Sequence, residues 1–248
     1  NNLGSALSIL GEHRERLDYF IQAVSAFNEA LKERKRELVP LDWAATKQNL
    51  GIVLSDLGER EKDTTYMKDA VAALEDALGE QPLEYVPVLW AMTYHNLGSA
   101  LFRLGILQEG TESLWKSVTA FNQASRVRVE EKFPLDWSAT QNNLGLALFE
   151  IGKREIKVDL MNKGLYAYKN ALKERQRDKT PYLWAETVNN LGTALLFIGE
   201  VKNDKEIINL AINAFQDVLD LYNEKGNQDL FNRMSQNLRS AKRALKNC

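Results

Sequence analysis

The sequence predicts an all-α fold, a solenoid superhelix built from antiparallel helical hairpins. The first observation behind this prediction is an internal repeat, because the tripeptide NLG recurs every 47 residues without an insertion. The second is that apolar residues within each repeat return at steps of three and four, the spacing of one face of an α-helix. A fixed period of this length is typical of stacked supersecondary units. The repeated asparagines are Asn2, Asn49, Asn96, Asn143 and Asn190.

The 47-residue period runs through all 248 residues, so we expect them to form a single array. We expect a truncated first repeat over residues 1–39 and a C-terminal capping helix over residues 228–248. Each unit of a solenoid buries its apolar face against its neighbours, so the whole array is expected to act as one domain. The four full repeats cover residues 40–86, 87–133, 134–180 and 181–227.

The first helix of each repeat, called helix A from here on, is expected to begin at a proline. In the first full repeat it covers residues 40–57, where Trp43, Leu50 and Leu57 share one face. Proline is tolerated there because the first helical N–H groups have no partner within the helix. We expect Gly58, just beyond the end, to take the left-handed cap conformation. The repeated residues are Pro40, Pro87, Pro134 and Pro181, and Gly11, Gly58, Gly105, Gly152 and Gly199.

The second helix, called helix B, is indicated by a further apolar pattern that includes Met67, Ala70 and Leu74. Another glycine recurs inside helix A, where glycine costs about 1 kcal/mol relative to alanine. We therefore expect helix B to approach helix A closely at this glycine, with a larger side chain filling the space beside it. The glycines are Gly4, Gly51, Gly98, Gly145 and Gly192, and the larger side chains are Phe27, Leu74, Phe121, Tyr168 and Phe215.

The capping helix departs from this pattern. Arg239 stands where the earlier repeats have glycine, so a following helix B could not approach in the same way. Lys242, Arg243 and Lys246 near its end complement the negative C-terminal end of the helix dipole.

Composition limits the partners. The chain has 32 basic and 34 acidic residues, a net charge of −2, so no overall basic field would attract nucleic acid or a membrane surface. No run of 18 or more apolar residues and no basic-then-apolar leader is present. The single cysteine, Cys248, can form no internal disulfide, which fits a reducing compartment. A cytoplasmic protein that contacts neither nucleic acid nor membrane is expected.

No catalytic or metal-binding constellation is present in the sequence. The two histidines, His13 and His95, have no cysteine or carboxylate cluster at ligand spacing. A serine such as Ser99 lacks an identified orienting carboxylate and oxyanion-stabilising group. We therefore expect no enzymatic activity, no cofactor and no metal.

The repeated motif resembles the tetratricopeptide repeat. The resemblance lies in NLGxAL, the LG that follows, and an alanine, an aromatic residue and a second alanine in helix B. The usual unit of that family has about 34 residues. The opening PLDWA-T-x-NLG resembles a long variant of the repeat seen in large bacterial multidomain proteins. The resemblance implies a binding scaffold, and the family binds peptides, folded proteins, lipids and small effectors alike.

Two polar columns on helix A are the candidate binding residues. The resemblance implies that the NLG asparagines face the concave groove and hydrogen-bond the backbone of an extended peptide. An amide suits this role because it donates and accepts at once. The alternative is an amide ladder that joins helix A of one repeat to helix A of the next, and the two roles can coexist. The candidates are Asn49, Asn96, Asn143 and Asn190 in one column and His95, Asn142 and Asn189 in the other.

Side chains beside the asparagines vary between repeats, as a surface that selects its ligand would. These variable side chains predict an exposed apolar strip flanked by His95 and Arg103. The alternative is that the same side chains pack between helices A and B. A clamp for an acidic tail is not expected in this groove, since Arg103 is its main cation. The strip comprises Phe102, Leu146, Phe149, Leu196 and Phe197.

Three functions remain open at this point. The first is a non-catalytic scaffold that binds an extended peptide in the groove lined by helices A. The second is a ligand-sensing module that binds a small molecule or lipid in the same concavity. The third is self-association through the truncated first repeat. An open trough with an amide ladder favours the peptide, whereas a deep closed apolar pocket favours the small ligand.

Overall fold

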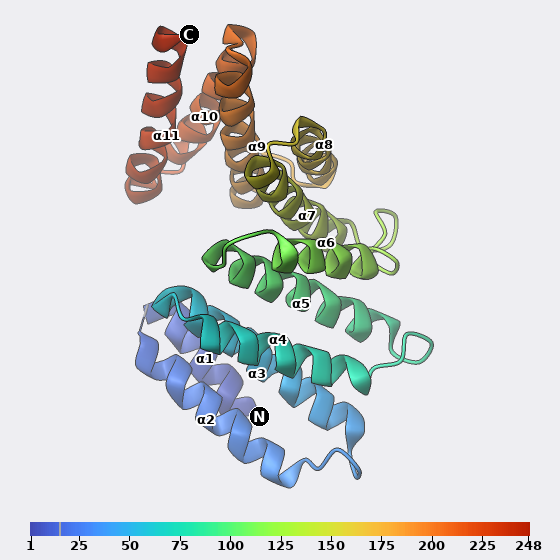
Figure 1. Ribbon diagram of the computed structural model, residues 1–248. Coiled ribbons are helices and arrows are strands. Elements are labelled where there is room, and N and C mark those ends of the chain that lie inside the picture. The colour runs from blue at the N-terminus through green and yellow to red at the C-terminus, as the bar shows by residue number, and fades with distance from the viewer. Residues whose placement is uncertain (15) are drawn as a thin grey trace. The chain divides into compact units, whose positions relative to one another are not determined.

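The computed structural model describes residues 1–14 and 16–248, with the backbone alone at residues 13 and 14. The described residues form eleven α-helices and no strand (Figure 1). The chain forms two compact units, Asn1–Arg128 and Val129–Cys248. The predicted all-α fold of helical hairpins is confirmed within each unit, while the course of a single superhelix through both units stays a prediction.

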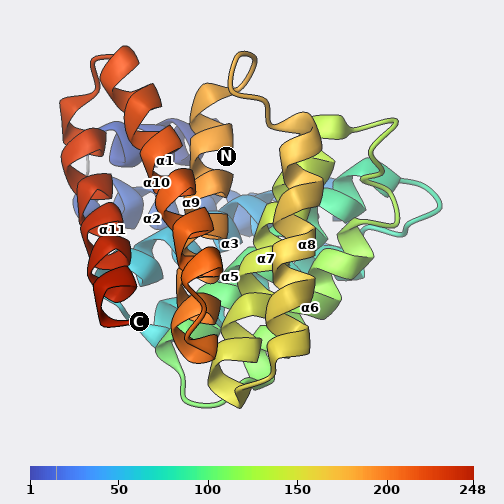
Figure 2. The same cartoon turned by 90° about the horizontal axis from the view of Figure 1, so that it is seen from above.

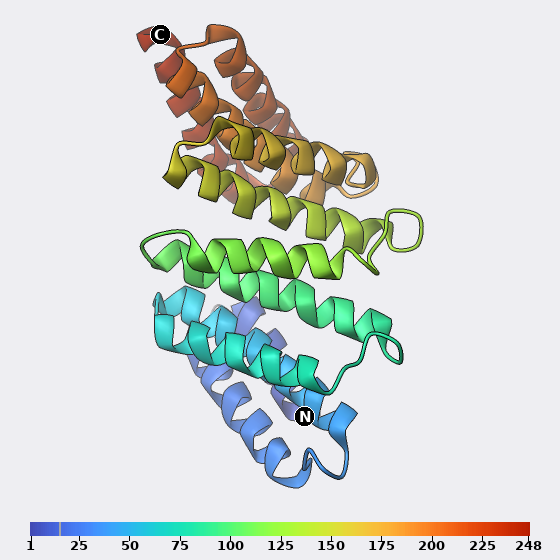
Figure 3. The same ribbon diagram turned by 45° about the vertical axis from the view of Figure 1, so that its right-hand side comes forward.

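The first unit contains three hairpins. Consecutive helices pair as α1 with α2, α3 with α4 and α5 with α6, and α2 and α4 also pack against the hairpins that follow them. Figure 3 shows the hairpins α3–α4 and α5–α6 as successive layers of this unit. The helices are α1 (Asn2–Arg14), α2 (Leu17–Glu33), α3 (Pro40–Glu61), α4 (Thr64–Gly79), α5 (Pro87–Leu107) and α6 (Glu112–Ala124).

The second unit contains two hairpins and a final single helix. Helix α7 pairs with α8 and α9 with α10, and α11 packs against α10 and α9. Figure 2 shows α10 and α11 side by side. The helices are α7 (Pro134–Glu155), α8 (Val158–Glu174), α9 (Pro181–Lys202), α10 (Lys205–Glu224) and α11 (Gln228–Asn247).

Helix A begins at its proline as predicted, but its end was predicted wrongly. Gly58 lies inside α3, which continues to Glu61, and the left-handed cap is Lys62 with φ 54°. The reason is packing, because a Cβ added to Gly58 would lie 2.7 Å from Met67 Cγ of α4. This second glycine column therefore provides another close approach between the two helices. The equivalent left-handed caps are Ile156 and Asn203.

The close approach predicted at the NLG glycine is present. A Cβ on Gly98 would lie 2.7 Å from Phe121 Cδ1, and one on Gly145 would lie 2.7 Å from Tyr168 Cε1. Phe121 and Tyr168 are themselves buried in the core. Helix B is thus held against helix A at two glycines, and the opposite face of helix A is left for other contacts.

Replacing Gly98 with leucine tests this packing. We expect the free energy of unfolding to fall by at least about 1–3 kcal/mol, because the new side chain overlaps Phe121. Gly79→Ala is the matched control, since its Cβ would meet only Arg36 Nη2 at 3.4 Å. Chemical denaturation measures both, and a Gly98→Leu protein as stable as the parent would show that the helices are not in close contact there.

Candidate functional site

Two small hollows lie on the helix-A side of the first unit, one between α1 and α3 and one between α3 and α5. The first hollow has a volume of about 180 Å³ and is lined by Asn49 among other residues. The second hollow has a volume of about 150 Å³ and is lined by Asn96. Because the two asparagines are one repeat apart, the same hollow is formed twice. Four further lining residues of the first hollow also lie one repeat, 47 residues, before a lining residue of the second. They are Ser5, Ser8, Ile9 and Ile52 in the first hollow, and their equivalents in the second are Ile52, Ser55, Asp56 and Ser99.

The amides that line these hollows have hydrogen-bonding capacity to spare. Asn49 and Asn96 are half-buried, and neither side chain hydrogen-bonds to any other residue that the structure describes. The neighbouring Gln48 differs, since it is buried and its Oε1 accepts from the Thr93 hydroxyl at 2.8 Å. Gln48, in the column beside the NLG asparagines, is therefore paired with Thr93, whereas the amides of Asn49 and Asn96 stay available to a ligand.

Arg103 is tied down by acidic neighbours. Its Nη1 donates to Asp56 Oδ1 at 2.7 Å and to Ser55 Oγ at 3.0 Å, and its Nε lies 3.0 Å from Glu59 Oε2. These contacts join α5 to α3 and neutralise the cation. Arg103 therefore gives the second hollow a polar wall, and its charge is already paired within the protein.

His95 and Phe102 lie on α5 and are both half-buried. The His95 ring packs against Phe121, with ring centroids 5.6 Å apart at an angle of 60°. One face of the imidazole thus covers the helix-B core, so only part of this side chain is available on the surface.

The second unit uses the same columns as a ladder. Asn190 Nδ2 donates to Asn142 Oδ1 at 3.2 Å, and Asn237 Nδ2 donates to Asn189 Oδ1 at 2.7 Å. Asn142 is completely buried. These bonds join α7 to α9 and α9 to α11, which supports the alternative role of these amides as a link between repeats.

Asn142 is also part of a charged network. Its Nδ2 donates to Asn143 Oδ1 at 3.2 Å and to Glu186 Oε1 at 3.3 Å, and Arg175 Nη1 donates to the other oxygen of Glu186 at 3.1 Å. Burial lowers the pKa of the Arg175 guanidinium from its usual value, and the Glu186 carboxylate opposes that shift. The network fixes α9 against both α7 and the end of α8.

The predicted apolar strip is partly core. Phe149 is only 8% exposed and packs with Tyr168, Ala194 and Ile198, so it was placed wrongly in an exposed strip. Its ring meets Phe197 edge-on with centroids 5.9 Å apart. The other members of the predicted strip, Phe102, Leu146, Leu196 and Phe197, are half-buried and reach the surface.

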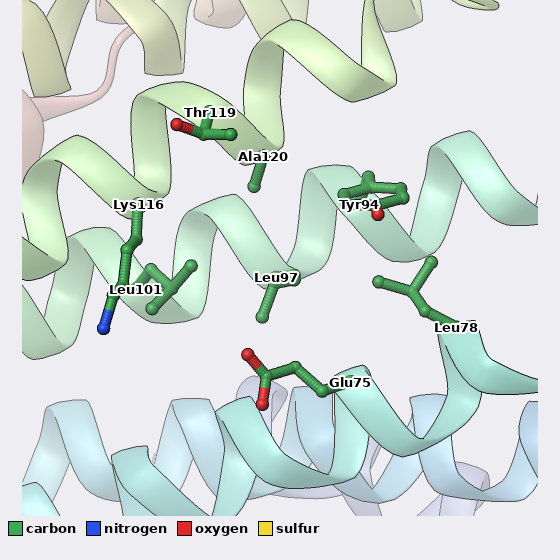
Figure 4. A pocket seen from close by; sticks show the side chains of 8 residues that line it. All are labelled: Glu75, Leu78, Tyr94, Leu97, Leu101, Lys116, Thr119 and Ala120. Atoms are coloured by element: carbon green, nitrogen blue, oxygen red, sulfur yellow. The ribbon is translucent and has the colours of Figure 1, made fainter.

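The sequence analysis missed a larger hollow on the helix-B side of the first unit, called the helix-B hollow. It lies between α4, α5 and α6 and has a volume of about 360 Å³. Figure 4 shows Leu97 and Leu101 on its floor, with Glu75 and Lys116 extending toward it from two sides. A hollow of about 370 Å³ lies one repeat earlier, over Leu50. The signal that could have found both is the same 47-residue period, applied to helix B.

Within residues 1–14 and 16–248, no group of three or more His, Cys, Asp or Glu side chains could hold a metal ion. No described helix is long and apolar enough to span a membrane. The side chain of His13 lies outside the described atoms.

These features define an α-helical tandem-repeat protein. The sequence profile of the tetratricopeptide repeat matches residues 43–83, which hold most of α3 and all of α4. The resemblance stated from the sequence is thereby confirmed on this hairpin. Such repeats mediate protein–protein contacts and are typically non-catalytic, so the match supports an interaction scaffold in general terms.

Two solved structures match the chain at low sequence identity and with TM-scores below 0.5. The crystal structure of BtubC (BKLC) from P. vanneervenii is 14% identical with a TM-score of 0.48, and the match covers 93% of this chain and 90% of that chain. A circular tandem repeat protein with novel repeat topology and enhanced subunit contact surfaces is 12% identical with a TM-score of 0.40, covering 93% and 65% of the two chains. The comparison with curated proteins found no match.

The contrast between the two units can be tested with two substitutions in one column. Asn190→Ala removes the donor to the buried Asn142 oxygen, so the free energy of unfolding should fall by about 1–3 kcal/mol. Asn49→Ala breaks no such bond and should be neutral, or stabilising by up to about 0.7 kcal/mol because alanine favours helix. Urea denaturation measures both, and equal losses would contradict the difference in hydrogen bonding.

Proposed function

We propose that this protein is a non-catalytic interaction scaffold that binds an extended polypeptide segment on the helix-A side of its first unit. The observation that carries the proposal is the recurrence of a hollow containing an unpaired asparagine amide, Asn49 in one and Asn96 in the next. An amide that donates and accepts can pair with a peptide group whatever side chain the peptide carries.

The spacing of the two hollows suits an extended chain. Helices α3 and α5, which carry Asn49 and Asn96, are in contact. Packed helices lie roughly 10 Å apart, and an extended chain advances about 3.3 Å per residue. Backbone groups about three residues apart in the ligand would therefore reach the two amides.

The size of the hollows favours side chains as occupants. At about 180 and 150 Å³ they are smaller than the roughly 300–1,000 Å³ of small-molecule sites. The first hollow is walled by Ile9, Phe27 and Ile52, so it suits an apolar side chain. The second contains the Asp56–Arg103 pair and suits a polar one. The alternative of a small molecule or lipid on this side is supported less well.

The second unit would contribute in a different way. Its amides Asn142, Asn189 and Asn190 are used between helices, while Leu146, Leu196 and Phe197 are half-buried apolar side chains of its helices A. We therefore assign backbone recognition to the first unit and at most apolar contacts to the second. A cytoplasmic location and self-association through the first repeat stay predictions.

The test begins with peptides selected from a random display library on the immobilised protein. Asn49→Ala together with Asn96→Ala should weaken the selected peptide by about ten- to a hundredfold, since two hydrogen bonds are lost. The fold should survive, because alanine is the better helix former. Asn122→Ala, on the exposed side of α6, is the matched control and should bind as the parent does. Unchanged affinity in the double variant would overturn the proposal.

A further inference from the structure

Helix α11 has one strongly basic face. A hollow of about 260 Å³ on it is lined entirely by Arg239, Lys242, Arg243 and Lys246, and all four side chains are exposed. The helix holds five basic residues and one acid, a net charge of +4 in a chain whose net charge is −2. The rest of the chain therefore carries −6, and the positive charge is concentrated on this helix.

The basic face replaces the face that receives helix B in the other repeats. Arg239 is 47 residues beyond Gly192, and Lys246 is 47 residues beyond Gly199. In α9 these glycines lie against α10, where an added Cβ would meet Phe215 at 2.8 Å and Ile208 at 2.7 Å. The helix face that packs against helix B in α9 thus carries four cations in α11.

The four cations are not neutralised by any residue that the structure describes. No described residue forms a side-chain ion pair or hydrogen bond with any of them. Some basic residues elsewhere in the second unit have acidic partners, for example Arg154 with Glu150 and Arg177 with Glu224. A cluster of like charges without counter-charges is unfavourable, and an anionic partner would relieve the repulsion.

We propose that this face of α11, from Arg239 to Lys246, binds an acidic polypeptide segment of a partner protein. The charge is confined to about two helical turns of an otherwise negative chain, so a short acidic segment matches it. A long polyanion would also meet the −6 of the remaining residues.

Two other anionic partners fit less well. The only aromatic residue of α11, Phe231, packs into the core with Met234, so the face has no stacking platform for the bases of a single strand. The apolar side of α11, including Leu238 and Ala241, is packed against α10, so it cannot insert into a membrane surface.

The experiment measures binding of a labelled synthetic peptide of alternating glutamate and alanine to the whole chain. A peptide with glutamine in place of glutamate is the matched probe. The protein variant is Lys242→Glu with Arg243→Glu, and the control is Lys163→Glu with Lys169→Glu, two exposed lysines of α8. Both variants change the net charge equally. Circular dichroism and thermal unfolding check that each variant is folded.

We expect the glutamate peptide to bind and the glutamine peptide not to bind. The affinity for the glutamate peptide should fall with added salt. It should also be at least about tenfold lower in the α11 variant, whereas the α8 variant should bind as tightly as the parent. Equal losses in both variants, or no binding to the parent, would overturn the proposal. If the parent prefers duplex DNA or phosphatidylserine vesicles to the glutamate peptide, and the α11 variant loses that preference, the proposal is also overturned. Self-association of the parent that the same variant abolishes would assign the face to a second copy, and would also overturn it.

Discussion

The arrangement of each hairpin depends on the close contact between helix A and helix B at two glycines. At Gly98 and Gly105, an added Cβ would lie 2.7 Å from a side-chain atom of α6. These contacts leave helix A only one rotational setting against helix B. Asn49 and Asn96, each two positions before the glycine of its NLG motif, then face the same side of their helices, which is why they line equivalent hollows.

The same amide column serves two purposes because its neighbours differ. Asn142 and Asn189 have short side chains whose oxygens accept from the asparagine of the next repeat, so the second unit is cross-linked through its amides. In the first unit Gln48 accepts from Thr93 instead, and Asn96 has no such bond among the described residues. An amide already hydrogen-bonded within the protein gains little from a ligand, whereas one without a protein partner can exchange water for a hydrogen bond to the ligand. This difference directs the proposed binding to the first unit.

Period and helical spacing were enough to predict the helices, the starting prolines and the tight contact at Gly98. They misjudged Gly58, because a glycine near a helix end looks the same whether it caps the helix or admits a neighbour. Phe149 was misplaced for a similar reason, since its burial depends on α8 and α9 rather than on its own helix. The helix-B hollow depends on three helices at once, and a single helical pattern carries no sign of it.

The central claim is that unpaired asparagine amides of the first unit meet the ligand backbone. Its most direct test is nuclear magnetic resonance of asparagine side-chain amides during titration with a selected peptide. We expect the Asn49 and Asn96 side-chain signals to shift, while the signals of the ladder amides Asn142 and Asn190 do not. Unshifted Asn49 and Asn96 signals, with shifts instead at the Leu97 and Leu101 methyl groups of the helix-B hollow, would contradict it.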